Sequence, residues 1–364
     1  MNTKRAKSQE HIAKSKGQRF KSQKIFTLYF LLFALSYMLL AAEGYAAQNG
    51  QIGRIAIFPF ENFSEDRDAL TYVMHLITNK LDKKFDILDE DRLDEFLLKE
   101  RIRSTGYVST DIAGKLREEL NVEAILIGSI NTFEKGDSPT VGFSARLVRS
   151  SDGKILWANH AAANGEDFTT ILNLGRITDI GKLTSKVLDE LLHSFSVVPP
   201  AKETESTFRI AVMPFQNETS SSNVGKIATN LFIVELFKSG KFEPIEFGEV
   251  RRLIVDLRVR EKGEINFKNI EAISDSSGVD GILVGTVEIY NEGLDNAAPP
   301  EVSISARLID ARKGRIIWSD FNEFKGDEDI VVLDWGRIRS VENAAYKAVT
   351  ALVKEIDRVK WNNT

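Results

Sequence analysis

Short apolar runs alternate with amphipathic stretches in the first half of the chain, a pattern typical of strands followed by helices. Residues 55–60 form an apolar run that contains a proline near its end, which predicts a buried strand. Apolar residues recur every three or four positions over residues 68–83, which predicts a helix. Phe85–Leu88 has the composition of a second short strand. Two further helices are predicted between this strand and residue 121.

After residue 121 the pattern changes from helical to alternating. Residues 122–130 have an unbroken apolar middle, which favours a strand buried on both faces. Residues 141–148 and 154–159 alternate on either side of the turn sequence Ser151-Asp152-Gly153, so they predict a β-hairpin. An amphipathic helix over residues 176–195 completes the unit. The predicted order is β-α-β-α-α-β-β-β-α, an α/β (α+β) fold with a mixed β-sheet and helices packed against it.

The second half of the chain repeats this pattern. Matching segments begin at Arg54 and Arg209, at Ile125 and Ile282, and at Ser144, whose partner Ser305 lies 161 residues further on. A spacing of this size is too long for a solenoid repeat of roughly 20–50 residues. It fits a whole domain of roughly 100–200 residues. We therefore predict two tandem copies of one domain, residues 47–196 and 209–360, joined by a linker at 197–208 that begins with a proline pair.

Residues 1–46 resemble a secretory signal peptide. Eight Lys or Arg lie within residues 4–24, an apolar run of about 18 residues follows, and small residues surround Ala46. Such a segment is either cleaved or retained as an N-terminal anchor, with its basic side in the cytoplasm. In both cases the two repeats are expected outside the cytoplasm, in the periplasm. Membrane contact is then expected only through this segment.

Composition excludes several classes of function. The chain has no cysteine, so disulfides, thiolate catalysis, cysteine metal sites and a lipid-modified cysteine are ruled out. Residues 1–46 contain eight Lys or Arg and two Glu, so without them the formal net charge falls from −5 to −11. An acidic body is repelled by phosphates, and nucleic acid is therefore not an expected partner.

Motifs that carry enzyme chemistry do not stand out. The four histidines are not at metal-ligand spacing, and there is no Gly-x-Ser-x-Gly or phosphate-binding loop. Acidic residues cluster over Asp86–Asp94, where a carboxylate pair could serve glycoside chemistry. The second repeat has only the scattered Glu243, Glu246 and Glu249 instead, which favours a solvated helix cap. We expect no catalytic residue, no metal and no cofactor, and a protein that is not an enzyme.

The residues kept in both repeats are the best candidates for a structural or interface role. They are Pro59 and Pro214, Asn62 and Asn217, Gly128 and Gly285, Arg146 and Arg307, Trp157 and Trp318, and Arg176 and Arg337. The Pro and Asn pairs suit a turn after the first strand, and glycine permits close approach in a packed strand. An unpaired guanidinium in mid-strand is costly to bury, so Arg146 and Arg307 should either face solvent or pair with a carboxylate.

The ordered motifs resemble a known family. The apolar strand with Pro-Phe-x-Asn, the Val122–Ile130 strand and the Ala-Arg-Leu to Ile-Leu-Trp hairpin are similar to the envelope superfamily that includes the curli secretion protein CsgG, the amino-terminal domain of TolB and the synthase activator LpoB. The likeness covers residues 54–195 and 209–356. It implies an exported, non-enzymatic protein that binds or assembles envelope proteins.

Two departures limit what this resemblance implies. CsgG is a lipoprotein, whereas this chain has no cysteine to lipidate. CsgG also builds a membrane barrel from two long hairpins, but the interval Asn131–Val141 is too short for strands of roughly 9–11 residues each. The stretch Ala158–Leu172 lacks the alternating apolar band of such strands. We therefore expect no transmembrane barrel and no pore.

Three hypotheses follow for the function. The first is an exported binding or scaffolding protein of the bacterial cell envelope, accessory to outer-membrane assembly, secretion or wall synthesis, with envelope proteins as partners. The second is a structural component whose copies form a homo-oligomeric ring in a secretion or appendage complex, so that its partner is itself. The third is a hydrolase that uses Asp86, Asp89 and Asp91.

Overall fold

A computed structural model of the chain describes residues 53–169, 175–196, 208–256, 267–293, 298–328, 330 and 336–359. The chain divides into two units between Gln51 and Ile52, and every described residue belongs to the second unit. The leader and residues 197–207 of the linker lie outside the described residues, so the domain limits stay predictions. Within the described ranges, no helix combines the length and apolar character that a membrane crossing needs.

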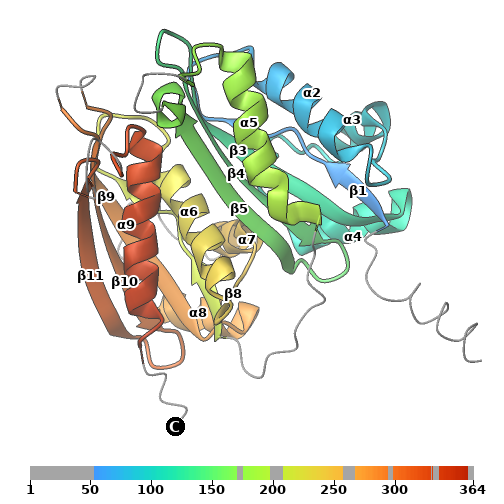
Figure 1. Cartoon of the computed structure of the whole chain (residues 1–364). Coiled ribbons are helices and arrows are strands. Elements are labelled where there is room, and N and C mark those ends of the chain that lie inside the picture. Colours follow the sequence, from blue (N-terminus) through green and yellow to red (C-terminus); the bar gives the residue numbers. More distant parts are fainter. Residues whose placement is uncertain are drawn as a thin grey trace, which may run out of the picture. The chain divides into compact units, whose positions relative to one another are not determined.

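The first repeat forms a five-stranded mixed sheet in the order β1-β3-β4-β5, with the short β2 paired to β3 (Figure 1). Strand β1 runs parallel to β3, and the β3, β4 and β5 pairs are antiparallel. The elements are β1 (Arg54–Ile57), β2 (Glu61–Asn62), α2 (Ala69–Leu81), α3 (Glu90–Lys99), α4 (Thr110–Leu120), β3 (Val122–Glu134), β4 (Thr140–Arg149), β5 (Ile155–Asn164) and α5 (Ile180–Leu192), with 3-10 helices at Gly165–Phe168 and His193–Ser196.

The second repeat forms a six-stranded sheet in the order β11-β10-β9-β6-β8, with β7 paired to β9. Its parallel and antiparallel pairs correspond to those of the first sheet. The elements are β6 (Phe208–Val212), β7 (Gln216–Asn217), α6 (Val224–Ser239), β8 (Phe242–Pro244), α7 (Phe247–Asp256), α8 (Phe267–Ser277), β9 (Gly281–Asn291), β10 (Glu301–Asp310), β11 (Arg315–Lys325) and α9 (Val341–Ile356).

The predicted fold class is confirmed, since each repeat is a mixed β-sheet with packed helices. The order of elements departs from the prediction in two ways: the two-residue strands β2 and β7 were not predicted, and the second predicted strand is formed only in the second repeat. One strand differs between the repeats. The predicted strand Phe85–Leu88 makes only a single bridge, between Ile55 and Ile87, whereas its counterpart β8 is a strand of three residues. Helix starts follow local chemistry, since Asp89 and Ser109 accept hydrogen bonds from the amides of the first turns of α3 and α4.

The two faces of the first sheet are covered by different helices. One face packs against α2 and α5 in a core that includes Leu126, Leu147 and Trp157. On the other face, α3 and α4 cover the β1 and β3 side, where Ala56 and Ile125 are buried. The remaining part of that second face, over β4 and β5, contacts α6 and α9 of the second repeat.

Helix α6 lies between the two sheets, together with α9 (Figure 1). It contacts β4 and β5 of the first repeat and β6, β8 and β9 of the second. Ten of its sixteen residues are buried, including Ile227, Phe232, Ile233 and Val234. A helix that is apolar all round is one that other elements enclose. The core around α6 therefore joins the repeats, and it includes Ile155 from β5.

A matched pair of substitutions tests whether α6 is enclosed by both sheets. Ile233 of α6 is buried, and the equivalent residue of α2, Thr78, is exposed. We expect Ile233→Ala to lower the free energy of unfolding by about 2–5 kcal/mol, because it opens a cavity in a core that cannot fully collapse. Thr78→Ala should change this free energy by less than about 0.5 kcal/mol. Denaturant titration of both variants checks the difference, and equal effects would contradict the placement of α6.

Candidate functional site

The Pro and Asn pairs shape the same turn in both repeats. Asn62 Oδ1 accepts hydrogen bonds from the amide and hydroxyl of Ser64, at 3.0 and 2.7 Å, and Asn62 Nδ2 donates to the Asp66 carbonyl at 2.7 Å. Asn217 makes the same three bonds at the same distances, to Thr219 and to the Ser221 carbonyl. The side chain closes an Asx turn that begins three residues after Pro59 or Pro214.

The glycine pair allows an aromatic ring to lie over the central strand. A Cβ on Gly128 would stand 2.6 Å from Phe60 Cε2 and 2.6 Å from the Ser144 carbonyl oxygen. Gly285 is in the same position against Phe215 and the Ser305 carbonyl. Glycine is required here because the backbone and the ring approach each other closely.

The tryptophans and the second arginine pair lie in local contacts of each repeat. Trp157 is buried, donates to Ser194 Oγ at 2.7 Å and meets the Phe195 ring edge-to-face at 4.9 Å. Trp318 is partly buried against the core around α6. Arg176 pairs with Glu166 at 3.2 Å and donates to the Asp137 carbonyl. Arg337 is half-buried before α9.

The Arg146 and Arg307 pair differs most between the repeats. Arg146 is only 1% exposed and lies where the second repeat covers the first sheet, whereas Arg307 is exposed on the second sheet. Arg146 forms a bidentate ion pair with Glu246, from Nε to Oε2 at 2.6 Å and from Nη2 to Oε1 at 3.0 Å. Both outcomes that the sequence left open are therefore realised, one in each repeat.

Each nitrogen of the Arg146 guanidinium has a partner. Nη1 donates to Asn230 Oδ1 of α6 at 3.1 Å, and Nη2 donates to the Gly106 carbonyl at 3.0 Å. Glu246 precedes α7 and is 1% exposed. A buried ion pair offsets its desolvation only with good geometry and satisfied hydrogen bonds, and this pair has both. It fixes where the second repeat sits on the first sheet.

A second buried polar cluster lies further along the same face. Glu342 of α9 is fully buried, and its Oε1 lies 2.8 Å from His160 Nε2 and accepts from Asn131 Nδ2 at 2.6 Å. Asn131 also donates to Ser144 Oγ at 2.9 Å. A Cβ on Gly142 would overlap the Glu342 carboxylate, so the glycine leaves the space that this side chain fills.

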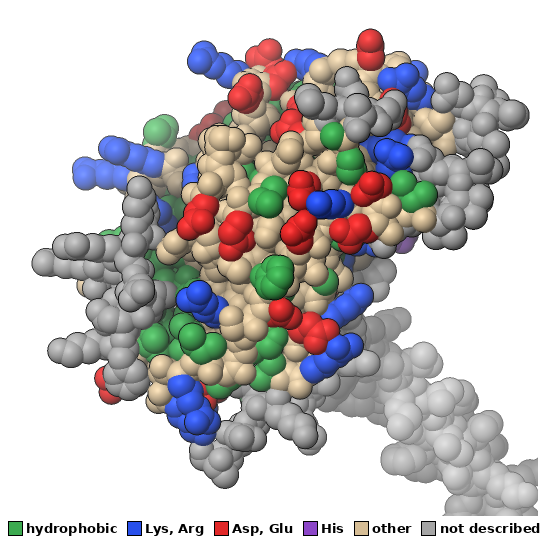
Figure 2. Space-filling view, turned by 90° about the vertical axis from the view of Figure 1, so that its left-hand side faces the viewer, with side chains coloured by type: hydrophobic (Ala, Val, Ile, Leu, Met, Phe, Trp, Pro, Cys, Tyr) green, Lys and Arg blue, Asp and Glu red, His purple; other side chains and the backbone are tan. Residues whose placement is uncertain are grey.

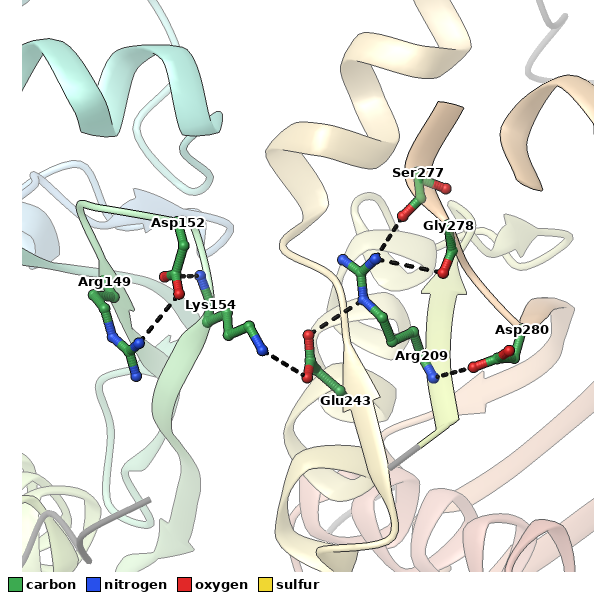
Figure 3. A network of polar contacts seen from close by, with 8 residues as sticks. All are labelled: Arg149, Asp152, Lys154, Arg209, Glu243, Ser277, Gly278 and Asp280. Carbon is green, nitrogen blue, oxygen red and sulfur yellow. Dashed lines mark hydrogen bonds and ion pairs between the residues drawn. The ribbon is translucent and has the colours of Figure 1, made fainter. Parts of the chain in front are cut away.

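Ion pairs continue to the rim of the contact (Figure 3). Glu243 of β8 forms ion pairs with Lys154 Nζ of the first repeat, at 3.2 Å, and with Arg209 Nε of its own repeat, at 3.2 Å. Glu249 accepts from the Thr110 amide at 2.6 Å. Burial alone would raise the pKa of the Glu249 carboxyl, but this amide and Arg252 outweigh burial and hold the pKa below its ordinary value.

The structure gives roles to acidic residues that the sequence did not single out. Glu243, Glu246 and Glu249 look scattered along the chain, yet each one bonds to the first repeat. Of the acidic cluster of the first repeat, Asp86 pairs with Arg54 and Asp89 caps α3. Among the described residues, no group of three or more His, Asp or Glu is arranged to hold a metal ion. The signal available in the sequence was α6, whose apolar residues are not confined to one side of the helix, as expected for a helix between two layers.

The candidate site is thus an interface, which we call the repeat interface. It is formed by the β3–β5 face of the first repeat and by α6, α7 and α9 of the second. Its chemistry is that of recognition, with a buried ion pair and buried hydrogen bonds that specify one docking geometry.

Substitution of Arg146 tests how much the repeat interface contributes to the free energy of unfolding. Arg146→Met leaves Glu246 buried without a partner, so we expect a loss of about 3–5 kcal/mol in the free energy of unfolding. Arg307→Met, at the equivalent exposed position, should change it by less than about 0.5 kcal/mol. The double variant Arg146→Met, Glu246→Leu should regain most of the loss. Denaturant titration at low protein concentration measures all three, and equal values for the two arginine variants would contradict this role.

No protein-family model matches the sequence, and no curated protein matches it. Among solved structures, the chain is similar to the PelC dodecamer from Paraburkholderia phytofirmans, with 18% identity and a TM-score of 0.29 over 41% of this chain and 89% of that chain. It is similar to the C-terminal domain of LpoB from Salmonella enterica, with 17% identity and a TM-score of 0.26 over 38% of this chain and 92% of that chain. TolB from Acinetobacter baumannii shares 13% identity, with a TM-score of 0.23 over 43% of this chain and 30% of that chain. The structural neighbours thus include LpoB and TolB, two of the envelope proteins that the ordered motifs resemble, over about two fifths of the chain.

Proposed function

We propose that this chain is an exported, non-enzymatic binding or scaffolding protein of the bacterial cell envelope, accessory to outer-membrane assembly, secretion or wall synthesis. The signal-like segment at residues 1–46 supports export to the periplasm. The observation that carries the binding role is a difference between the two sheets. The β3–β5 face of the first repeat is covered by helices of the second, and the equivalent face of the second repeat is exposed.

This exposed surface, which we call the open sheet face, consists of the outward side chains of β9, β10 and β11. The strand register places Ser305 opposite Phe321 and Arg307 opposite Ser319 on this side. Phe321 is 66% exposed and Ile316 is 56% exposed. Figure 2 shows hydrophobic side chains beside acidic and basic ones on the side of the molecule that carries β11.

Such a surface has the composition of a protein-binding site. Large apolar side chains exposed beside charged ones mark contact surfaces more often than isolated apolar residues do. An aromatic anchor with arginines around it is also typical of the residues that contribute most to binding. The buried repeat interface keeps the platform rigid, because α6 and α9 support the second sheet from behind.

A photo-reactive side chain placed at Phe321 tests the proposal in exporting cells. We expect it to cross-link to protein in the envelope fraction roughly tenfold more than the same group at Leu98, which is 80% exposed on α3 of the first repeat. Cell fractionation should find the chain in the periplasm. Equal cross-linking at both positions, together with tight binding of a small molecule by the purified chain, would reject a protein-binding role.

A further inference from the structure

The repeat interface joins two different surfaces, and each surface exists twice in the chain. The first repeat contributes a sheet face, and the second contributes the side of its helices that points away from its own sheet. The second repeat has its own open sheet face, and the first repeat has its own outward helix face on α2 and α5. A contact between two different surfaces can continue from one molecule to the next.

Hydrogen bonds establish which residues of the two repeats are equivalent. The Leu88 amide donates to the Ile55 carbonyl at 2.8 Å, and the Ile245 amide donates to the Ile210 carbonyl at 2.9 Å. The ion pair of Arg54 with Asp86, at 3.0 Å, returns as Arg209 with Glu243, at 3.2 Å. By the same spacing, Asp89 corresponds to Glu246. The hairpin turns also match, since the Gly153 amide bonds to the Arg149 carbonyl and the Gly314 amide to the Asp310 carbonyl.

These equivalences show which residues of the open sheet face and of the outward α2–α5 face correspond to contact residues of the repeat interface. Lys154 pairs with Glu243 inside the chain. The corresponding residues are Arg315, which is exposed at the start of β11, and Asp86, whose side chain is 59% exposed beside Arg54. Arg315 and Asp86 therefore have opposite charges, as Lys154 and Glu243 do. Unlike that pair, they lie on surfaces that do not meet in the repeat interface.

Two further contacts have complementary charges at their equivalent positions on the open sheet face and the α2–α5 face. The buried pair of Arg146 with Glu246 corresponds to Arg307 and Asp89, both of which are exposed. At the third contact, Asn343 of α9 donates to the Ala162 carbonyl of β5 at 2.9 Å. Its equivalents are Lys182 of α5 and Glu323 of β11, which are exposed and opposite in charge.

Side-chain volume on the helix face also differs between the repeats. In the repeat interface, Glu342 of α9 fills the space beside His160 and Gly142. In the equivalent positions, the helix face has Gly181 and the open sheet face has Phe321. The sheet position keeps a ring, because Phe321 stands where the first repeat has His160, and the helix position loses its carboxylate. A Cβ on Gly181 would lie 2.7 Å from the Tyr72 hydroxyl, so Tyr72 fills part of this space.

We propose that a second copy of this chain docks its α2–α5 face on the open sheet face, and so repeats between chains the contact that joins the two repeats within a chain. The outward side of α2 carries Thr71, His75 and Thr78, where α6 has Lys226, Asn230 and Ile233. The position of the apolar Ile233 is therefore polar on α2, as expected for a surface that also meets water. This inference names the partner for the binding role proposed above and rests on it.

The absence of cysteine allows a direct test with engineered pairs. The chain with Asp86→Cys and Arg315→Cys, exported and purified in its processed form, is treated with a short bismaleimide. We expect covalent dimers and larger multiples of the chain. The variant with Glu243→Cys and Lys154→Cys, the equivalent pair within the chain, should form an intramolecular cross-link and remain a monomer. This result would show that the reagent spans the distance.

A control pair and a charge reversal complete the test. Asp86→Cys with Lys313→Cys, where Lys313 lies in the turn between β10 and β11, should give roughly tenfold fewer dimers. Arg307→Glu with Arg315→Glu should weaken self-association, measured by light scattering, at least about tenfold, and raised salt should weaken it further.

Only monomers from the test pair, while the internal pair reacts, would overturn the inference. If the photo-reactive group at Phe321 captures a different envelope protein and no second copy of the chain, self-docking is also overturned, but the proposed binding function stands. If this group captures no protein at all, both fail.

Discussion

The ion pair between Arg146 and Glu246 is the contact on which the arrangement of the two repeats depends. Both side chains are 1% exposed, and the guanidinium has a partner at each of its nitrogens. A charge buried here without its partner would be strongly destabilising. The pair therefore permits one docking position of the second repeat on the first sheet, and the apolar packing of α6 contributes stability around it.

The duplicated domain uses one helix position in two ways. Helix α2 is buried on one side only, against its own sheet, whereas α6 is enclosed by two sheets. The two helices therefore differ in burial mainly on the outward side, where Thr78 of α2 is exposed and Ile233 of α6 is buried. Residues kept in both repeats, such as Asn62 and Asn217, hold turns inside each domain. The contact between the repeats combines the kept Arg146 with residues that differ between them, namely Ile233, Glu246 and Glu342.

Much of the fold could be predicted because it depends on local pattern. Apolar periodicity and turn chemistry identified the strands, the helices and the duplicated order of elements. The single bridge at Ile87, in place of a full strand, was not predictable, because strand pairing depends on the neighbouring strand as well as on composition. The interface was missed because Glu246 and Glu342 meet residues at least 100 positions away in the chain, and nothing near them in the sequence indicates these partners.

One pair of segments shows what the sequence determines and what the tertiary structure adds. The segments are Ser144-Ala145-Arg146-Leu147 and Ser305-Ala306-Arg307-Leu308. The sequence by itself determined that each segment is a strand with an arginine on one face and apolar residues on the other, because alternation sets the faces of a strand. It also required that each arginine find either a carboxylate or water. Only the tertiary structure decided that Arg146 is buried and Arg307 is exposed, because burial depends on which surface packs over the strand, and the two strands are identical in this segment.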